Sequence, residues 1–558
     1  MSNDKSTKNF LTLAVAEAQS YLTINQIEHA LENKEEIKNL PLQPLYLAYN
    51  SLPTEKKTAL LPSLSSEQRQ LFLDIDLWNK DEINVDNFLP WVSIYAACGD
   101  ENLQYEFAKS SEFALFFKGR FNVWTFDAED PLYPESNNYF LTDDGLLLIE
   151  YDEDFAFVDE LKLLIKNLYT QEGVEKAYAY LFKLIADQMS SLSEDEYRWK
   201  KHRLEDKGMV DYFEALEKLN RFPSKKHMIN FIRLAKPSTG KVEEDSINQV
   251  PHFNFIAPVS TVSDDLQAEL SKVSEQSRID FLKFNLVKLI NSDIEVSGGL
   301  SLGTIALSKG SKRVKNFIQL GYEFALCEWK ELTREGEFFD YFTLTDLYRF
   351  GKTLIELQQA TLNKKYTELE LDETFDSFLG HWAQTFIAQA FEKETVEDFT
   401  GETLSLETMS GYERFERLVD LITSITPFAK AFQGRFIELK TSGQLSSDFY
   451  LNYDLEDIDF NTLLLSNFAQ YALEINSNDG KGKLALTIDE YKNFAALAHS
   501  EDISAKVSLF ARDFGLSEVN LIDEYINYLL SDSFEGVEIK NLSDDEFKHM
   551  GGPIILSL

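Results

Sequence analysis

The sequence predicts a mainly α-helical protein that carries one small β-containing insert. Gly (24) and Pro (13) are scarce in its 558 residues, whereas a β-sandwich or barrel needs a turn about every 8–12 residues. The chain is 44% hydrophobic and contains 43 Phe, so it can bury a large interior. Its length exceeds what one ordinary core supports, which predicts several domains.

Residues 39–74 repeat with a period of twelve and predict a helical repeat domain over residues 1–110. The three rows are NLPLQPLYLAYN, SLPTEKKTALLP and SLSSEQRQLFLD. Thr54 and Ser65 or Ser66 precede EKKTALL and EQRQLFL as natural helix caps. Each row is therefore expected to be a turn followed by a short helix. Because such helices are unstable alone, they must stack on one another, as in a solenoid.

Residues 111–155 predict a β-containing insert. The runs EFALFF, FNVWTF, YFLT and LLLIEY are rich in aromatic and branched residues, which is typical of strands. Asp144 and Gly145 stand between the last two runs, and this dipeptide is a strong hairpin signal.

Helical spacing returns after the insert and predicts a helical region over residues 156–240. Leu161, Leu164, Ile165 and Leu168 form an i, i+3, i+4, i+7 stripe. Ser193 and Glu196 match a capping box, so a helix is expected to begin there.

The rest of the chain is predicted to be a linker over residues 241–265 and a helical C-terminal part over residues 266–558. The segment before residue 266 is rich in Pro and polar residues and has little periodicity. Amphipathic patterns dominate after it.

The formal net charge of −40 opposes nucleic-acid binding, which requires Lys and Arg to neutralise phosphates. Anionic membranes would repel the chain for the same reason. No run of 18 apolar residues is present, so membrane insertion is not expected. The N-terminal run FLTLAVA reads as the start of a helix rather than a signal peptide. With only two cysteines, these features predict a cytoplasmic protein.

Twelve carboxylates and no Lys or Arg lie between Phe121 and Leu161. Clustered carboxylates can hold Mg²⁺ or Ca²⁺, although no established ligand spacing is met. The alternative is a solvated acidic face, or one paired with the basic residues Arg198, Lys200, Lys201, Arg203 and Lys207. The candidate metal ligands are Asp127, Glu129, Asp130, Asp152 and Asp154.

Residues 299–303 (GLSLG) match the G-x-S-x-G nucleophile elbow and make Ser301 a candidate catalytic serine. The elbow needs a buried strand before it, and the preceding NSDIEVSG is a poor strand. Close packing around the glycines is the alternative use of this motif. No other catalytic or cofactor-binding motif is found, so no cofactor is expected apart from the Mg²⁺ or Ca²⁺ discussed above.

Two resemblances extend these inferences. The leucine–proline turns and short helices of residues 35–95 resemble the N-terminal intracellular superhelical domain of the MgtE magnesium transporters. A larger part of the chain resembles an uncharacterised bacterial family of unknown function and of about this length. The matching stretches include YNSLPTEKKTALLPSLSSEQRQLFLDIDLW, FALFFKGRFNVWTFDAEDPLYP, NYFLTDDGLLLIEY, EYRWKKHRLEDKGMVDYFEALE and GGPIIL. The resemblance to this family implies no activity.

The sequence therefore predicts a non-catalytic interaction or scaffold protein that binds protein partners, with an acidic insert offered either to a basic partner or to divalent cations. A helical repeat offers an extended surface to a partner, and the acidic insert is the most distinctive part of that surface. A divalent-cation-responsive regulator and a serine hydrolase using Ser301 are the alternatives.

Overall fold

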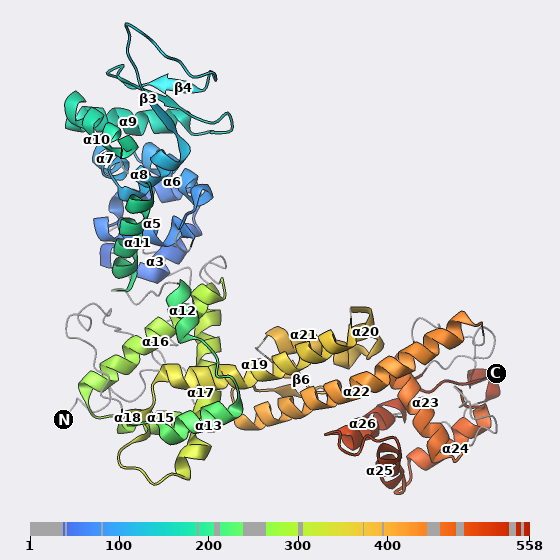
Figure 1. The fold of residues 1–558 in the computed structure, drawn as a ribbon. Coiled ribbons are helices and arrows are strands. Elements are labelled where there is room, and N and C mark those ends of the chain that lie inside the picture. Colours follow the sequence, from blue (N-terminus) through green and yellow to red (C-terminus); the bar gives the residue numbers. More distant parts are fainter. Residues whose placement is uncertain are drawn as a thin grey trace. The chain divides into compact units, whose positions relative to one another are not determined.

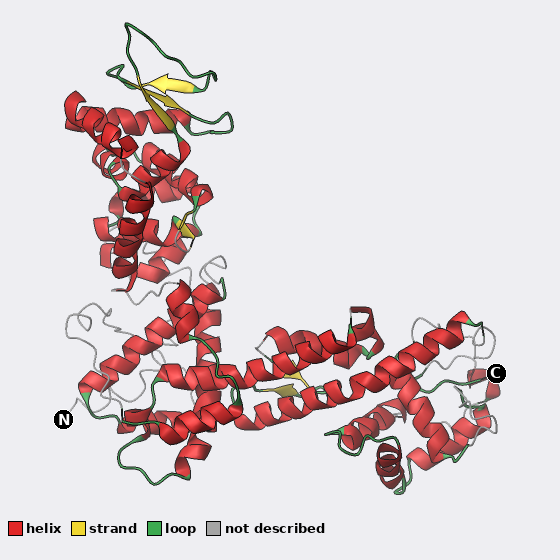
Figure 2. Ribbon diagram, viewed as in Figure 1, coloured by secondary structure: helices red, strands yellow, loops and turns green. Residues whose placement is uncertain are grey.

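The computed structural model is mainly helical and has only small sheets, which confirms the predicted fold class (Figure 2). Its contacts divide the chain into two compact units. The first comprises Met1–Asn220, Ala235–Lys315 and Thr333–Tyr348, and the second Arg221–Leu234, Asn316–Leu332 and Arg349–Leu558. The structure describes residues 37–39, 42–79, 82–186, 189–205, 212–237, 264–298, 305–371, 373–392, 395–443, 458–475, 485–534, 543–547 and 552–557.

The repeated segment folds as predicted into short helices separated by turns. They are α3 (Leu42–Asn50), α4 (Thr54–Leu60) and α5 (Ser66–Asp76). Ser65 caps α5 in a reciprocal capping box with Gln68, with N···O distances of 3.0 and 3.1 Å. The expected cap at Thr54 is wrong, because Pro53 is the N-cap residue of α4 and makes no side-chain bond.

Six further helices of the first unit lie before and after residues 121–157 in sequence (Figure 1). Aromatic stacking fills their interior: the ring centroids of Phe88 and Phe116 are 4.1 Å apart, as are those of Tyr95 and Phe107. The helices are α6 (Val85–Ala97), α7 (Glu101–Ala108), α8 (Ser111–Arg120), α9 (Val158–Glu172), α10 (Val174–Ala186) and α11 (Met189–Glu205), and a small hairpin of β1 (Trp78–Asn79) and β2 (Glu82–Ile83) precedes α6.

The predicted strand EFALFF is wrong, because these residues lie in α8. Ser110 caps this helix by accepting the N–H of Phe113 at 3.1 Å. Phe113, Phe116 and Phe117 are all buried. A short helix that is buried on all sides has no apolar stripe, so its periodicity does not distinguish it from a strand.

The other three predicted strands form an antiparallel sheet in the order β3-β5-β4, from β3 (Asn122–Thr125), β4 (Tyr139–Leu141) and β5 (Leu147–Glu150). The predicted hairpin between β4 and β5 is confirmed. Gly145 adopts φ +66° and donates its N–H to the Thr142 carbonyl at 2.8 Å. The central strand β5 is buried on both faces, whereas β3 and β4 are the sheet edges.

The remaining elements of the first unit are also helical. The buried stripe of α9 (Leu161, Leu164, Ile165 and Leu168) confirms the predicted amphipathic helix. The helices that follow are α12 (Tyr212–Lys218), α15 (Asp264–Lys272), α16 (Gln276–Val296) and α18 (Phe338–Tyr341), and both α17 (Ile305–Lys330) and α19 (Leu344–Leu369) contribute residues to each unit.

The second unit packs helices around an aromatic core and contains one two-stranded hairpin. Within the described part of the chain, no helix combines the length and apolar character that a membrane span requires. The predicted linker lies outside the described residues except for its last two. The second unit contains α13 (Lys225–Leu234), α20 (Glu373–Phe378), α21 (His381–Glu392), β6 (Val396–Glu397), β7 (Thr403–Leu404), α22 (Met409–Thr441), α23 (Phe460–Ala472), α24 (Ile488–Ala498), α25 (Ile503–Asp513), α26 (Ile522–Phe534) and α27 (Asp544–Phe547).

Candidate functional site

The surface of the insert is acidic and exposed. Nine of the twelve carboxylates between Phe121 and Leu161 are exposed: Asp127, Glu129, Asp130, Glu135, Asp143, Asp152, Glu153, Asp154 and Asp159. Five large apolar side chains of the same segment are also exposed: Trp124, Leu132, Tyr133, Leu141 and Leu146. We call these fourteen side chains the acidic surface.

The apolar members of the acidic surface are unusually accessible for their size. Leu132 is 72% exposed and Tyr133 is 56% exposed. The Tyr133 ring centroid lies 5.5 Å from that of Phe126 and 5.7 Å from that of Tyr139. These contacts fix the loop after β3 on the sheet while its apolar side chains face solvent.

The predicted metal ligands fall into two separate groups. Asp127, Glu129 and Asp130 follow β3, and Asp127 Oδ1 accepts the N–H of Glu129 at 2.9 Å. Asp152 and Asp154 follow β5 in the chain. Both pair with Arg120, at N···O distances of 3.5 and 3.2 Å. Arg120 therefore supplies positive charge to the second group. A metal at the insert stays a prediction.

The predicted basic partners of the insert have other contacts. Arg198 pairs with Glu194 on its own helix at 2.7 Å, and Arg203 pairs with Asp74. Lys207 lies outside the described residues. Neither Glu194 nor Asp74 belongs to the insert, so these two arginines leave its exposed carboxylates available to solvent.

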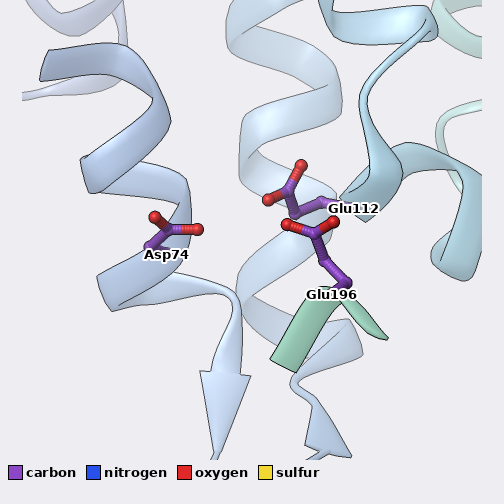
Figure 3. A group of neighbouring side chains, drawn as sticks. All are labelled: Asp74, Glu112 and Glu196. Atoms are coloured by element: carbon purple, nitrogen blue, oxygen red, sulfur yellow. The ribbon is translucent and has the colours of Figure 1, made fainter. Parts of the chain in front are cut away.

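A second acidic group is buried between three helices (Figure 3). Asp74 comes from α5, Glu112 from α8 and Glu196 from α11, and one carboxylate oxygen of each lies within 4.8 Å of the others. Across the residues that the structure describes, no other group of three such side chains meets this spacing. This cluster is not among the sites predicted from the sequence.

Arg203 lies against all three carboxylates. Its Nε and Nη2 donate to the two oxygens of Asp74, each at 2.7 Å. Nη2 also donates to Glu196 Oε1 at 2.6 Å and lies 3.7 Å from Glu112 Oε1. Gln70 completes the group by donating to Glu112 Oε1 at 2.6 Å. We call these five side chains the buried carboxylate cluster.

Burial controls the protonation of this cluster. Burial, together with the neighbouring negative charges of Asp74 and Glu196, raises the pKa of Glu112 to about 7. Burial also raises the pKa of Asp74, although Arg203 opposes this shift. For Arg203, burial lowers the pKa, but its hydrogen bonds with Asp74 and Glu196 more than offset the effect and leave the pKa raised. The charged guanidinium and a readily protonated Glu112 are thus the expected states near neutral pH.

The cluster is arranged as an internal ion network. Its guanidinium occupies the position between the carboxylates that a cation would take, so a metal ion would have to displace Arg203. Three carboxylates around one guanidinium leave excess negative charge, which the raised pKa of Glu112 reduces. We conclude that the cluster joins α5, α8 and α11.

Only weak signals for this cluster are present in the amino-acid sequence. The predicted capping box at Ser193 and Glu196 is wrong, because α11 runs through both positions and Glu196 turns inward instead. Glu112 precedes the apolar run FALFF, and Asp74 stands within LFLDIDLW. A single charge in an apolar run is a signal for a buried ion pair, but it does not identify the partner.

Ser301 lies outside the described residues, so its catalytic role stays a prediction. The chain before it is helical through Val296, and Ser297 ends α16. A nucleophile elbow instead follows a strand directly. The immediate context therefore differs from that of a hydrolase elbow.

The fold and these sites define a mainly α-helical protein with a small acidic β-sheet insert. The chain belongs to the family of unknown function DUF6178, whose model matches residues 8–476. This confirms the resemblance to an uncharacterised family. No curated protein and no solved structure gives a significant match, and the resemblance to the MgtE superhelical domain stays a prediction.

Proposed function

We propose that the chain is a non-catalytic cytoplasmic interaction protein that binds a basic protein partner through its acidic surface. The observation that carries this proposal is the combination of exposed apolar side chains and exposed carboxylates on one short insert. Leu132 and Tyr133 are more than half exposed and lie beside Asp127, Glu129 and Asp130 in the chain.

The apolar side chains and the carboxylates of this surface support different parts of the proposal. Large exposed apolar groups mark sites where proteins associate, and Trp and Tyr are frequent anchors of interfaces. The carboxylates would steer a basic partner toward the surface and repel acidic proteins. Because nine of these carboxylates are exposed, the cationic side chains of a partner can reach them directly.

The fold supports a positioning role for the helices around the insert. The sheet that displays the acidic surface has its central strand buried on both faces. Arg120 anchors the end of the insert through Asp152 and Asp154. The surface is therefore displayed on a fixed scaffold, which limits the ordering cost of binding.

The test is a comparison of partner recovery from native lysate, using the full chain and a surface variant. The variant carries Asp127→Asn, Asp130→Asn and Leu132→Ser, which remove two charges and the most exposed apolar side chain of the insert. We expect a stoichiometric partner with the natural chain and at least a tenfold loss with the variant.

A matched control variant carries the same chemical changes in the second unit. It combines Glu501→Gln, Asp502→Asn and Leu509→Ser, all at exposed positions. This control should recover the partner as the natural chain does. Equal loss in both variants, or no stoichiometric partner with the natural chain, would contradict the proposed function.

A further inference from the structure

The strand β3 is a sheet edge with a regular hydrogen-bonding pattern. Its partner β5 lies on one side only, in the order β3-β5-β4. The Phe126 N–H donates to the Leu146 carbonyl at 2.8 Å, which continues the register Thr125↔Leu147 by one residue. Hydrogen-bonded pairs alternate along an antiparallel ladder, so positions 122, 124 and 126 bond to β5.

The intervening residues of β3 point their backbone groups away from β5. These are Val123 and Thr125, which occupy the non-hydrogen-bonded positions. Their N–H and C=O groups face the free edge, and no described residue provides a hydrogen bond to them there. The edge therefore offers two donors and two acceptors at the spacing of a further strand.

A groove of about 340 Å³ borders this edge. It is lined by Phe117, Lys118, Phe121, Asn122, Val123, Trp124 and Leu184. Asn122 and Trp124 point to one face of the sheet and Val123 to the other, because side chains alternate along a strand. Residues from both faces of β3 line the groove, and no residue of β5 does. The groove therefore follows the free side of β3.

The groove combines aromatic and aliphatic side chains with the polar Lys118 and Asn122, while the chain that continues from β3 is acidic. Its aromatic and aliphatic lining includes Trp124, which is 46% exposed. Lys118 directs its ammonium to the Leu184 carbonyl at 2.9 Å. Beyond Thr125, the next charged residues are Asp127, Glu129 and Asp130, and no Lys or Arg occurs before residue 162.

We propose that an extended basic segment of the partner adds to the free edge of β3 as a further strand and places one apolar side chain in the groove. This proposal rests on the proposed function and specifies its binding mode. Main-chain bonds to Val123 and Thr125 would give affinity, as in other cases of strand addition. The groove would select an apolar residue, and the adjacent carboxylates would select Lys or Arg near it.

The other sheet edge, β4, has outward-facing backbone groups but contributes no residue to this groove. The outward-facing backbone groups of β4 belong to Tyr139 and Leu141, because Tyr151 and Thr142 donate their N–H groups within the β4–β5 ladder. The groove residues come from α8, α10, β3 and the chain joining α8 to β3, and none belongs to β4. The groove, with the aromatic side chains in its lining, therefore favours β3.

The probe for this proposal is a labelled peptide with blocked ends and the sequence KVKVKVKV, titrated against the full chain by fluorescence anisotropy. We expect saturable binding at 150 mM salt. The decisive variant is Thr125→Pro, which removes one outward N–H while leaving every β3–β5 bond in place. We expect at least a tenfold weaker affinity for Thr125→Pro and a less than twofold change for Thr125→Val, which keeps the N–H.

Two comparisons separate strand addition from general charge attraction. The first is the same peptide with its backbone N-methylated at alternate residues, which keeps its charge but prevents ladder formation. The second is Trp124→Ala, which removes part of the groove lining. Each should weaken binding at least fivefold. Matching melting temperatures for Thr125→Pro and Thr125→Val would show that both variants are folded.

The outcomes distinguish this inference from the proposed function. Equal affinities of Thr125→Pro and Thr125→Val, an N-methylated peptide that binds as well as the parent, or no saturable binding would overturn strand addition. If the cellular partner is then lost from the surface variant but kept by Thr125→Pro, the proposed function stands and only the binding mode is wrong. Loss of the partner in Thr125→Pro as well as in the surface variant supports both.

Discussion

Arg203 on α11 forms a two-point ion pair with Asp74 on α5, with both N···O distances at 2.7 Å. The two residues are 129 positions apart in the chain. Asp74 is fully buried, so its charge depends on this contact and on the hydrogen bond from Gln70. This ion pair links α11 to α5 within the buried carboxylate cluster.

Replacing Arg203 with Met should strongly destabilise the first unit. Three carboxylates would remain buried without their guanidinium, and breaking a buried ion pair in this way costs about 3–5 kcal/mol. The free energy of unfolding from urea titration measures the effect. The control is Arg198→Met, whose exposed pair with Glu194 should contribute less than about 1 kcal/mol. Equal stabilities of the two variants would contradict the role assigned to the cluster.

The raised pKa of Glu112 predicts a pH-dependent stability. The folded protein holds this proton up to a pH of about 7, whereas an unfolded Glu releases it near its ordinary pKa. The contribution of the Glu112 proton to the free energy of unfolding is therefore fully present at pH 4 and is lost as the pH rises through about 7. It amounts to on the order of 3 kcal/mol.

Glu112→Gln tests this dependence because Gln stays neutral and can still accept the bond from Gln70. We expect the variant to gain stability relative to the natural chain between pH 5 and pH 8, as measured by urea titration at each pH. The exposed substitution Glu501→Gln should show no such trend. A difference between Glu112→Gln and the natural chain that does not change with pH would refute the assigned protonation.

The capping box of α5 predicts a modest and local effect. Ser65→Ala removes the oxygen that accepts the Gln68 N–H, and such a cap contributes about 1 kcal/mol. The neighbouring Ser66→Ala keeps the cap and should change the free energy of unfolding by less than about 0.5 kcal/mol. Thermal and urea unfolding of both variants measure the difference, and equal effects would argue against the cap.

Two glycines should respond to alanine in opposite directions. Gly145 has φ +66° in the β4–β5 turn, so Gly145→Ala should cost about 1–2 kcal/mol. Gly434 lies within α22 with no atom near an added Cβ, so Gly434→Ala should stabilise by about 0.5–1 kcal/mol. Urea unfolding of the two variants measures both signs. A stabilising Gly145→Ala would contradict the turn geometry.

Local sequence signals predicted much of the fold. Leucine–proline turns and the Ser65 cap located the short helices, and Asp144-Gly145 located the hairpin. The signals failed where tertiary contacts decide. The aromatic run of α8 is surrounded by other helices, which removes the polar face that would reveal a helix. Glu196 resembles part of a cap in sequence, yet helix α11 runs through it, and its carboxylate accepts a hydrogen bond from Arg203, seven residues later.

The candidate sites also differ in whether local sequence or tertiary contacts determine them. The acidic surface could be predicted because its carboxylates are close together in sequence. The buried carboxylate cluster could not, because Asp74, Glu112 and Glu196 come from helices that are distant in the chain. The groove beside β3 is lined by both Leu184 of α10 and Trp124, and no local sequence pattern indicates that these residues share a groove.

Site-specific photo-crosslinking in living cells tests most directly whether a basic protein binds the acidic surface. A photoreactive amino acid replaces Tyr133, which is 56% exposed on the acidic surface, or Leu509, which is 41% exposed in the second unit. We expect one abundant adduct from position 133 with a basic protein, and a lower yield of that adduct from position 509. No adduct from position 133, or the same adduct in equal yield from both positions, would contradict binding of a basic protein at the acidic surface.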